Sequence, residues 1–465
     1  MNINKTNTHS ISEELAQFIT NVKVPEQVNT ITKKYLLDWI GSTIAGSDSE
    51  PAKITRKIPE ILGGLPQATI ISNGVKTSLT LAAFANAASA HVVEMDDLDR
   101  GSVTHPGAPI ISTALAIGEY IDCTLTELLE AISIGYEICI RTGEALGTNH
   151  YEKWHTTGTA GTLGCTAAAA RLMKLDTESS INAIGTSGTM AAGLWQFLED
   201  GAMSKQLHPA KAAHDGILSV LLAKESFTGA RKIFEGKKGL LNSMSNNSDA
   251  NKMNLCLNKL ESMPEAWKIN NVSFKVHSSC RHTHAAVDAA IKIATTNSIH
   301  LNDIESVSVE IYSQALGLLD GVEPFSPWAA KFSLPFCVAT GLIHKDCSRI
   351  RFTKETIGDE KTILLANKIS FKTKPEFDEM YPIAWPSTVT VTMYDGSMYY
   401  ARIDYPSGDP ETNITESEII DKFKTMVVSE IGINSKEIIS LIFDESIRFS
   451  IQNLIQYAVP SNSTT

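Results

Sequence analysis

The chain has 465 residues, of which 43% are hydrophobic and 20% charged, and its formal net charge is −12. This composition is typical of a globular protein and too apolar for a disordered chain. The length predicts two or three domains. The acidic balance argues against a nucleic-acid partner, because affinity for a phosphate backbone requires a basic face.

The seven cysteines are scattered along the chain, without a CxxC pair. This pattern predicts reduced thiols rather than a disulfide framework. The N-terminal segment lacks the apolar core of a signal peptide. No apolar run approaches the ~18 residues that a membrane helix requires. We therefore expect a cytoplasmic protein without membrane attachment.

A helical period runs from about residue 10 to residue 270. Apolar residues recur at three- and four-residue spacing from Val28 to Ile40, after a proline at position 25 that suits a first helical turn. Later helices are rich in Ala and Gly, and small residues allow helices to approach closely, which predicts a tightly packed bundle. These expected helices span residues 80–92, 107–119, 126–146, 159–173, 180–196 and 209–224.

The pattern changes after about residue 270. Residues 307–311 alternate between apolar and polar, as in a half-buried strand. Residues 388–392 and 398–403 favour strands and flank Asp395-Gly396, which predicts a hairpin. The helices expected in this part span residues 283–295 and 328–343.

The order of these elements predicts the domain organisation. Residues 1–270 form the first part of a helical domain, residues 271–405 a smaller inserted α+β domain, and residues 406–465 return to the helical domain. In this last part a helix is expected over residues 416–429. The fold class is therefore mainly α with an inserted α+β domain.

Four short polar segments stand out against these helices, and the first covers residues 91–106, HVVEMDDLDRGSVTHP. Its acidic run is similar to the aspartate-rich metal motif of terpene synthases. However, Arg100 stands where DDxxD needs an aspartate, so magnesium binding is not favoured. Helix capping and substrate orientation are the alternatives for these acids. His105 lies where a helix is expected to begin, and backbone N–H groups at such a position favour an anion.

Two further segments place histidines beside helix starts. His155 precedes TTGTAGT, whose glycines match no nucleotide-binding motif. Lys205 and His208 precede the next expected helix, and Lys211 and His214 follow on it. Helix starts usually prefer acids, so these cations indicate either a solvated basic helix start or an anion site.

The fourth segment is KVHSSCRHTH, residues 275–284. A zinc site built on Cys280, His282 and His284 would normally need a second ligand pair, and none is evident. Lys275 and Arg281 suit carboxylates, and histidine exchanges protons near neutral pH, so a polycarboxylate site is the favoured interpretation. No nucleophile elbow, nucleotide loop or cofactor motif accompanies the four segments.

These segments, in this order, resemble the MmgE/PrpD family of 2-methylcitrate dehydratases, cis-aconitate decarboxylases and iminodisuccinate epimerases. The resemblance spans about residues 10–430. It implies a helical domain built from both chain ends, a smaller α+β lid domain, a homodimer and no required cofactor. The matching phrases are DWIGSTIAGS (38–47), EMDDLDRGSVTHPGAPI (94–110), WHTTGTAGTLG (154–164), GTMAAGLWQFLEDGAMSKQLHPAKAAHDG (188–216), CRHTHAAVDA (280–289) and AKFSLPFCVATGL (330–342).

The resemblance also implies which side chains act. The residues that correspond to the family's pocket, and that we expect to be catalytic, are His105, His155, Lys205 and Lys275. The decarboxylases carry a histidine in a KRFPAH-like phrase where this chain has Cys280, which argues against decarboxylation of cis-aconitate. The expected substrate-binding residues are Asp97, His208, Cys280, Arg281 and His282, and no metal ligand is expected.

The chemistry that these enzymes share is a carbanion formed beside a carboxylate, which requires cations in a dry pocket. The resemblance therefore implies a cofactor-independent lyase of the 2-methylcitrate dehydratase type, which removes an α-proton from a small di- or tricarboxylate and eliminates water. Lys205, Lys275 and Arg281 would hold the carboxylates. His105 and His155 would be acid and base, in either order. This interpretation requires that all these side chains meet in one pocket.

Other functions remain open. An epimerase or a decarboxylase acting on a similar polycarboxylate begins with related carbanion chemistry. More distant alternatives are a metal-dependent hydrolase that uses Asp96, Asp97, His282 and His284, and an inactive binding protein.

Overall fold

The computed structural model describes residues 10–427, 434–444, 446 and 450–460, which divide into two compact units. The larger unit contains the chain up to Val92, the residues from Asp96 to Val272, and those from Glu416 onward. The smaller unit contains Val93–Met95 and Ser273–Thr415. Among the helices of the described residues, none combines the length and hydropathy that crossing a membrane demands.

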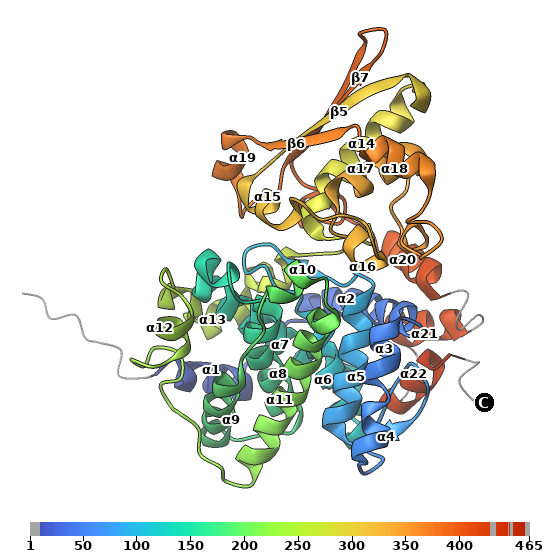
Figure 1. Cartoon of the computed structure of the whole chain (residues 1–465). Coiled ribbons are helices and arrows are strands. Elements are labelled where there is room, and N and C mark those ends of the chain that lie inside the picture. The colour runs from blue at the N-terminus through green and yellow to red at the C-terminus, as the bar shows by residue number, and fades with distance from the viewer. Residues whose placement is uncertain (1–9, 428–433, 445, 447–449, 461–465) are drawn as a thin grey trace, which may run out of the picture. The chain divides into compact units, whose positions relative to one another are not determined.

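The larger unit is helical (Figure 1) and carries the short antiparallel pair of strands β1 and β2. Its centre is formed by α8, which packs against α6, α7, α9 and α11, and by α5, which packs against α2, α6 and α11. From the C-terminal part of the chain, α20 packs against α2. The main helices are α1 (Ile11–Asn21), α2 (Glu26–Gly46), α5 (Leu79–Val92), α6 (Gly107–Ile121), α7 (Leu125–Tyr151), α8 (Thr156–Leu172), α9 (Thr177–Met190), α11 (Leu207–Lys224), α20 (Glu416–Val427), α21 (Asn434–Phe443) and α22 (Ile451–Ala458).

Shorter elements complete this unit. The short helices are α3 (Glu50–Thr55), α4 (Ile58–Leu62), α10 (Gln196–Asp200), α12 (Leu240–Met244) and α13 (Leu257–Ser262). The short strands are β1 (Ala68–Thr69), β2 (Lys76–Thr77) and β3 (Leu98–Asp99), and β4 (Val272–Ser273) lies where the chain passes into the smaller unit.

Small residues bring the central helices close together. Where α7 meets α8, a Cβ atom on Gly164 would lie 2.7 Å from the carbonyl oxygen of Gly135 and 2.7 Å from Cβ of Cys139. A Cβ atom on Gly216 of α11 would overlap Cβ of Cys165 in α8. Larger side chains would force these helices apart, so the prediction of a tightly packed Ala- and Gly-rich bundle is confirmed.

The predicted helices exist, with differences at their ends. α9 ends at Met190, before the expected residue 196, and α11 begins at Leu207, two residues before Pro209. A proline fits there because the first N–H groups of a helix have no partner within it. The helix expected over residues 416–429 is α20, and residues 428 and 429 lie outside the described part.

The smaller unit is built on a four-stranded sheet in the order β6-β5-β7-β8. β5 (Ile304–Ile311) pairs in parallel with β6 (Ile369–Thr373) and antiparallel with β7 (Ser387–Met393). β7 continues through the predicted Asp395-Gly396 hairpin into β8 (Met398–Ile403), which confirms that turn. The strand β6 was not among the predicted elements.

Helices cover this sheet. α14 (His284–Thr296) packs on β7 and β8, and α17 (Leu334–His344) packs against α14 and α18 (Figure 1). The single helix expected over residues 328–343 is interrupted, since a short α16 (Pro327–Ala330) precedes α17. Pro335 has no N–H to bond to a carbonyl four residues earlier, so it fits the first turn of a new helix and not the interior of a continuous one. The remaining helices are α15 (Ser313–Leu319), α18 (Glu360–Ala366) and α19 (Pro375–Met380).

Candidate functional site

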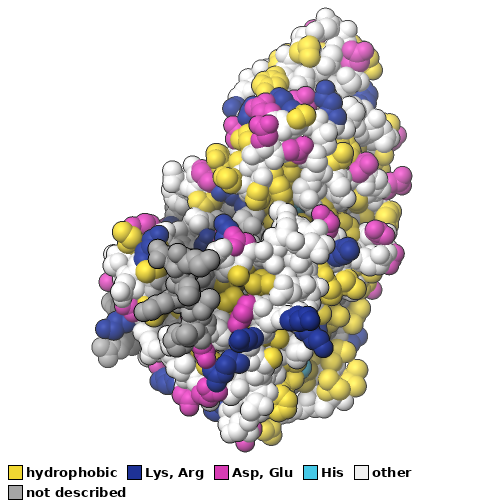
Figure 2. Space-filling model, turned by 90° about the vertical axis from the view of Figure 1, so that its left-hand side faces the viewer, with side chains coloured by type: hydrophobic (Ala, Val, Ile, Leu, Met, Phe, Trp, Pro, Cys, Tyr) yellow, Lys and Arg dark blue, Asp and Glu magenta, His cyan; other side chains and the backbone are white. Residues whose placement is uncertain are grey.

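Most of the described histidines are buried, and histidine is almost absent from the face drawn in Figure 2. Four of them lie together inside the larger unit: His91, His105, His155 and His208. The ring centroids are 4.9 Å apart for His91 and His105, 5.6 Å for His91 and His155, and 5.2 Å for His155 and His208. We call these four residues the histidine cluster. The structure thus brings together three of the histidines that the sequence singled out.

Helix ends position the cluster. His155 immediately precedes α8, and its backbone N–H donates to the carbonyl of Gly193 at 2.9 Å. The backbone N–H of His105 donates to the hydroxyl of Thr157 at 3.0 Å, within the first turn of the same helix. His91 lies in the last turn of α5, and His208 is the second residue of α11.

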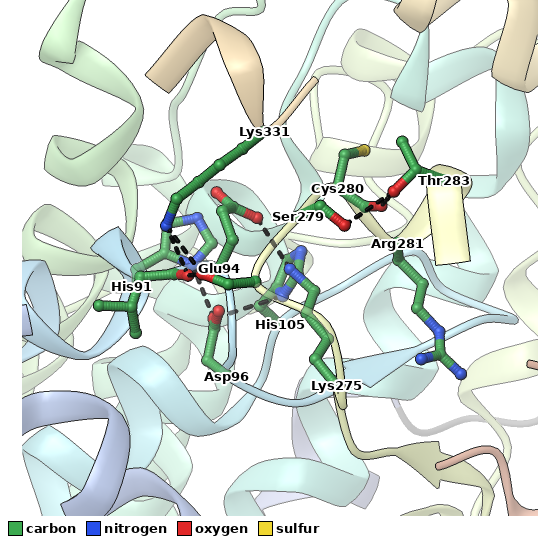
Figure 3. A network of polar contacts seen from close by, with 12 residues as sticks. His91, Glu94, Asp96, His105, Lys275, Ser279, Cys280, Arg281, Thr283 and Lys331 are labelled. Atoms are coloured by element: carbon green, nitrogen blue, oxygen red, sulfur yellow. Dashed lines mark hydrogen bonds and ion pairs between the residues drawn. The ribbon is translucent and has the colours of Figure 1, made fainter. Parts of the chain in front are cut away.

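Asp96 joins two members of the cluster (Figure 3). Its Oδ2 lies 2.7 Å from Nδ1 of His91 and 3.3 Å from Nδ1 of His105, whose Nδ1 is also 2.8 Å from the carbonyl oxygen of Asp97. Both neighbours of the His105 Nδ1 are acceptors, so this nitrogen carries a proton and Nε2 is the atom that gains or loses one. Burial opposes ionisation of Asp96, but His91 and His105 hold its pKa well below the usual value. His91 was not among the predicted site residues, and Asp96 was named only for the metal-dependent alternative.

The side chain of Asp97 is used differently. Its carboxylate accepts hydrogen bonds from the N–H of Gly107 at 2.9 Å and from the hydroxyl of Tyr136 at 2.6 Å. The partner of the backbone N–H at the start of α6 is therefore a carboxyl group of the protein itself. Burial raises the pKa of Asp97 to about 8, although the bond from Tyr136 opposes the shift. Of the two alternatives for these acids, helix capping describes the contacts of Asp97, whereas the carboxylate beside His105 belongs to Asp96.

The turn that leads into His105 is strained. Val103 has φ of 51°, in the left-handed region that a β-branched residue rarely adopts, and it is buried. The Asp99 carboxylate closes the turn by accepting hydrogen bonds from the N–H and the hydroxyl of Ser102, at 2.8 and 2.7 Å. Strain of this kind persists only where the surroundings fix the backbone, and it is frequent at functional segments.

His155 and His208 share a proton. Their Nδ1 atoms lie 3.0 Å apart, so one ring donates and the other accepts. Trp195 lies beside His155, with ring centroids 4.8 Å apart, and Phe197 lies 5.5 Å from His208. Burial, followed by nearby positive groups, lowers the pKa of His155 well below its usual value and that of His208 to about 4. Both rings are therefore neutral near pH 7.

Lys205 accompanies this pair, whereas the two cations that follow it do not. Lys205 is buried in a short 3-10 turn before α11, and its charge is among the causes that lower the pKa of His155 and His208. Lys211 donates to the Asp215 carboxylate, and Nδ1 of His214 lies 2.9 Å from it. The anion that balances Lys211 and His214 thus lies in the same helix.

One group in the described part of the chain has metal-ligand character. His91, Asp96 and His105 each offer a ligand atom, and these atoms lie within 4.8 Å of one another. Their mutual contacts have hydrogen-bond distances, so a bound Zn²⁺ would have to replace the shared protons.

In the smaller unit, two lysines converge on the segment Val93–Met95 (Figure 3). Nζ of Lys275 lies 2.8 Å from the Glu94 carboxylate, and both side chains are buried. Lys331 donates to the carbonyl of Val93 at 2.7 Å and to the hydroxyl of Ser278 at 3.1 Å. Glu94 and Lys331 were not singled out in the sequence, although both lie inside the phrases quoted above.

The other predicted residues of this unit have partners within it. Arg281 donates to the buried Asp409 carboxylate. His282 stacks on Trp385, with centroids 4.2 Å apart, and bonds through Nδ1 to the hydroxyl of Tyr312. The N–H of Cys280 donates to the Lys331 carbonyl at 2.9 Å. It stays a prediction that four residues of this unit contact the same substrate as the histidine cluster, namely Lys275, Cys280, Arg281 and His282.

Known proteins resemble the chain over most of its length. Residues 13–253 match the MmgE/PrpD N-terminal domain, and residues 277–445 match the MmgE/PrpD C-terminal domain. A cis-aconitate decarboxylase-like protein, oryM, of Aspergillus oryzae is 22% identical over 445 residues, which cover 91% of each chain. The cis-aconitate decarboxylase of Aspergillus terreus is 22% identical over 446 residues, 90% of this chain and 89% of its own. The human cis-aconitate decarboxylase is 22% identical over 432 residues, 89% of this chain and 87% of its own.

Proposed function

Because this chain belongs to the MmgE/PrpD family, we propose that it is a cofactor-independent lyase that removes an α-proton from a small di- or tricarboxylate and eliminates water. The observation that carries the proposal is the histidine cluster, in which buried imidazoles share protons with one another and with one carboxylate. Proton removal from carbon needs a base and an acid held in a water-poor place. The cluster supplies side chains of both kinds.

His105 is the proposed general acid. An ionised carboxylate beside an imidazole favours the protonated ring, and Asp96 occupies that position at 3.3 Å. With Nδ1 donating to Asp96 and to the Asp97 carbonyl, Nε2 is the atom that delivers a proton to the departing hydroxyl.

His155 is the proposed general base. Its lowered pKa keeps the ring neutral, and its Nδ1 is engaged with His208, so Nε2 is the atom that takes the α-proton. A bound polycarboxylate brings negative charge that offsets the nearby cations and strengthens this base. The charge of Lys205 would stabilise the enolate-like intermediate.

Decarboxylation is the second candidate, and it is favoured by the similarity to two cis-aconitate decarboxylases and one decarboxylase-like protein. The same acid would protonate the carbanion that remains after loss of CO₂. Against it stands Cys280, since the family resemblance implies a histidine at this position in the decarboxylases. Elimination of water therefore remains the first assignment.

The test is incubation of the purified protein in D₂O with a panel of di- and tricarboxylates, followed by NMR. Elimination yields an alkene, decarboxylation releases CO₂, and an epimerase only exchanges the α-proton. Folded His105→Asn and Lys205→Met variants should lose about 10²–10⁴-fold in turnover, the usual contribution of such groups. The exposed His300 provides a control substitution, His300→Asn, that should leave turnover unchanged. Absence of any reaction across the panel, or near-wild-type turnover in either folded variant, would overturn the assignment.

The metal alternative is tested in the same assay. Exhaustive chelation should leave turnover intact if His91, Asp96 and His105 are joined by protons, as their distances suggest. Loss of turnover that added Zn²⁺ restores would instead identify a metal-dependent enzyme.

A further inference from the structure

We propose that His208 is a relay residue that acts through His155, so that the proton taken from the substrate leaves the histidine cluster instead of returning to carbon. The inference rests on the proposed function, because it concerns the base of that reaction. His208 was expected to bind substrate, but its Nδ1 is engaged with His155.

The geometry allows two arrangements of the neutral pair. At an Nδ1–Nδ1 distance of 3.0 Å the two rings hold one proton between them. In the first arrangement His155 donates that proton, and its Nε2 has a lone pair. In the second, His208 donates it, and His155 carries its own proton on Nε2. Passage from the first arrangement to the second leaves both rings neutral, because one proton is gained at Nε2 of His155 and one is lost from Nε2 of His208.

Removal of the α-proton uses this passage. The C–H bond breaks, its electron pair stays on carbon, and the proton forms an N–H bond at Nε2 of His155. The Nδ1 proton of His155 moves to Nδ1 of His208, and His208 releases its Nε2 proton to water. His155 ends neutral, and one proton has left the pair. His105 later regains from water the proton that it gives to the departing hydroxyl, so the overall reaction is balanced.

The surroundings disfavour storage of the proton on the pair. After burial itself, the positive groups that lower the pKa of one or both rings are His91, His105, Lys205 and Lys211. His155 is 1% exposed and His208 7%, so His208 is the member nearer to solvent.

The loop after α9 lies close to the His208 ring. Gly193 has φ of 146°, which side-chain-bearing residues rarely adopt, and a Cβ atom on it would lie 3.2 Å from Nδ1 of His208. A Cβ atom on Gly158 would lie 2.5 Å from the carbonyl oxygen of Ala192 in the same loop. The space beside the imidazole therefore has little room for a side chain at position 193, and Nδ1 of His208 faces His155 at 3.0 Å.

The experiment compares two rates in D₂O, with substrate and elimination product at equilibrium. One is exchange of the substrate α-proton for deuterium, and the other is interconversion of ¹³C-labelled substrate and product. In the wild type we expect exchange to be at least as fast as interconversion. In His208→Asn, whose amide can keep the hydrogen bond to His155 but cannot relay, the ratio should fall by about tenfold or more. A merely structural role would lower both rates together and leave the ratio unchanged.

His150 provides the matched control. It is buried in the same unit, its pKa is also lowered to about 4 by burial, and it bonds to the Met244 carbonyl and the Thr159 hydroxyl, away from the pair. His150→Asn should keep the wild-type ratio. A wild-type ratio far below one, or an unchanged ratio in His208→Asn, would overturn the relay. If His208→Asn does not fold, the relay is tested by the wild-type ratio and by the same ratio measured in His208→Gln. No interconversion of any substrate by the wild type would instead count against the proposed function itself.

Discussion

The two units use the same kinds of side chain in different ways. In the larger unit, imidazoles share protons: His155 bonds to His208, and the single Asp96 carboxylate serves both His91 and His105. In the smaller unit, three basic side chains each pair with one carboxylate, whereas the buried Lys331 donates to a carbonyl and a hydroxyl. These dedicated pairs are Lys275 with Glu94, Arg281 with Asp409, and His277 with Asp288.

This difference between shared protons and separate ion pairs indicates two roles, proton transfer in the larger unit and positioning of the backbone in the smaller unit. A proton shared between two similar groups can move, because neither position is much more stable than the other. A dedicated buried ion pair does the opposite, since removing either charge leaves the other uncompensated. We infer that the histidine cluster is arranged for chemistry and that the ion pairs of residues 275–284 fix the backbone of that segment.

The largest expected effect comes from breaking one dedicated pair. Asp409→Asn removes the charge opposite Arg281 and should destabilise the smaller unit by about 3–5 kcal/mol. The control is Asp404→Asn, which breaks a more exposed pair with Arg402 in the same unit and should cost about 1 kcal/mol or less. Hydrogen exchange of the backbone amides of β7 and α14 would measure the loss of stability in both variants. Equal effects of the two substitutions would contradict a fixing role for the buried pair.

The second effect is a pH dependence of the larger unit. His208 has a pKa of about 4 when folded and about 6.5 when unfolded, so the unfolded chain binds more protons between these values. Stability should therefore fall as the pH drops from 6.5 toward 4, by about 3 kcal/mol from this residue. Urea unfolding of wild type and His208→Asn across this range isolates the contribution by subtraction. A difference between them that does not change with pH would show that His208 is not buried in its neutral form.

Local sequence signals predicted most of the fold. The Ala- and Gly-rich helices and the Asp395-Gly396 hairpin follow from periodicity and turn chemistry within a few residues. β6 was missed although Ile369 and Phe371 alternate with polar residues, and its place in the sheet depends on parallel pairing with β5, whose last residue lies far before it in the sequence. The inclusion of Val93–Met95 in the smaller unit likewise depends on distant contacts, such as that of Lys275 with Glu94.

The residue types of the candidate site were also predictable, but their partners were not. The sequence drew attention to His105, His155 and His208, yet it could not show that His155 and His208 bond to each other. Nor could it decide which of two adjacent aspartates reaches His105. That choice depends on the turn that contains the left-handed Val103, a conformation that no sequence pattern indicated.

The adjacent aspartates give the smallest and sharpest prediction. Asp96→Asn keeps the shape of the side chain but removes the charge that accepts protons from His91 and His105. Hydrogen bonds to charged groups contribute about 1.5–3 kcal/mol, so turnover should fall about 10- to 150-fold. Asp97, with a pKa of about 8, is mostly protonated at pH 7. The oxygen of an asparagine amide can accept from Gly107, and its NH₂ group can donate to the Tyr136 oxygen. Asp97→Asn should therefore cost less than about fivefold. A larger loss of turnover in Asp97→Asn than in Asp96→Asn would assign the orientation of His105 to Asp97. The reason is that an isosteric neutral replacement affects turnover only where the charge of the carboxylate is used.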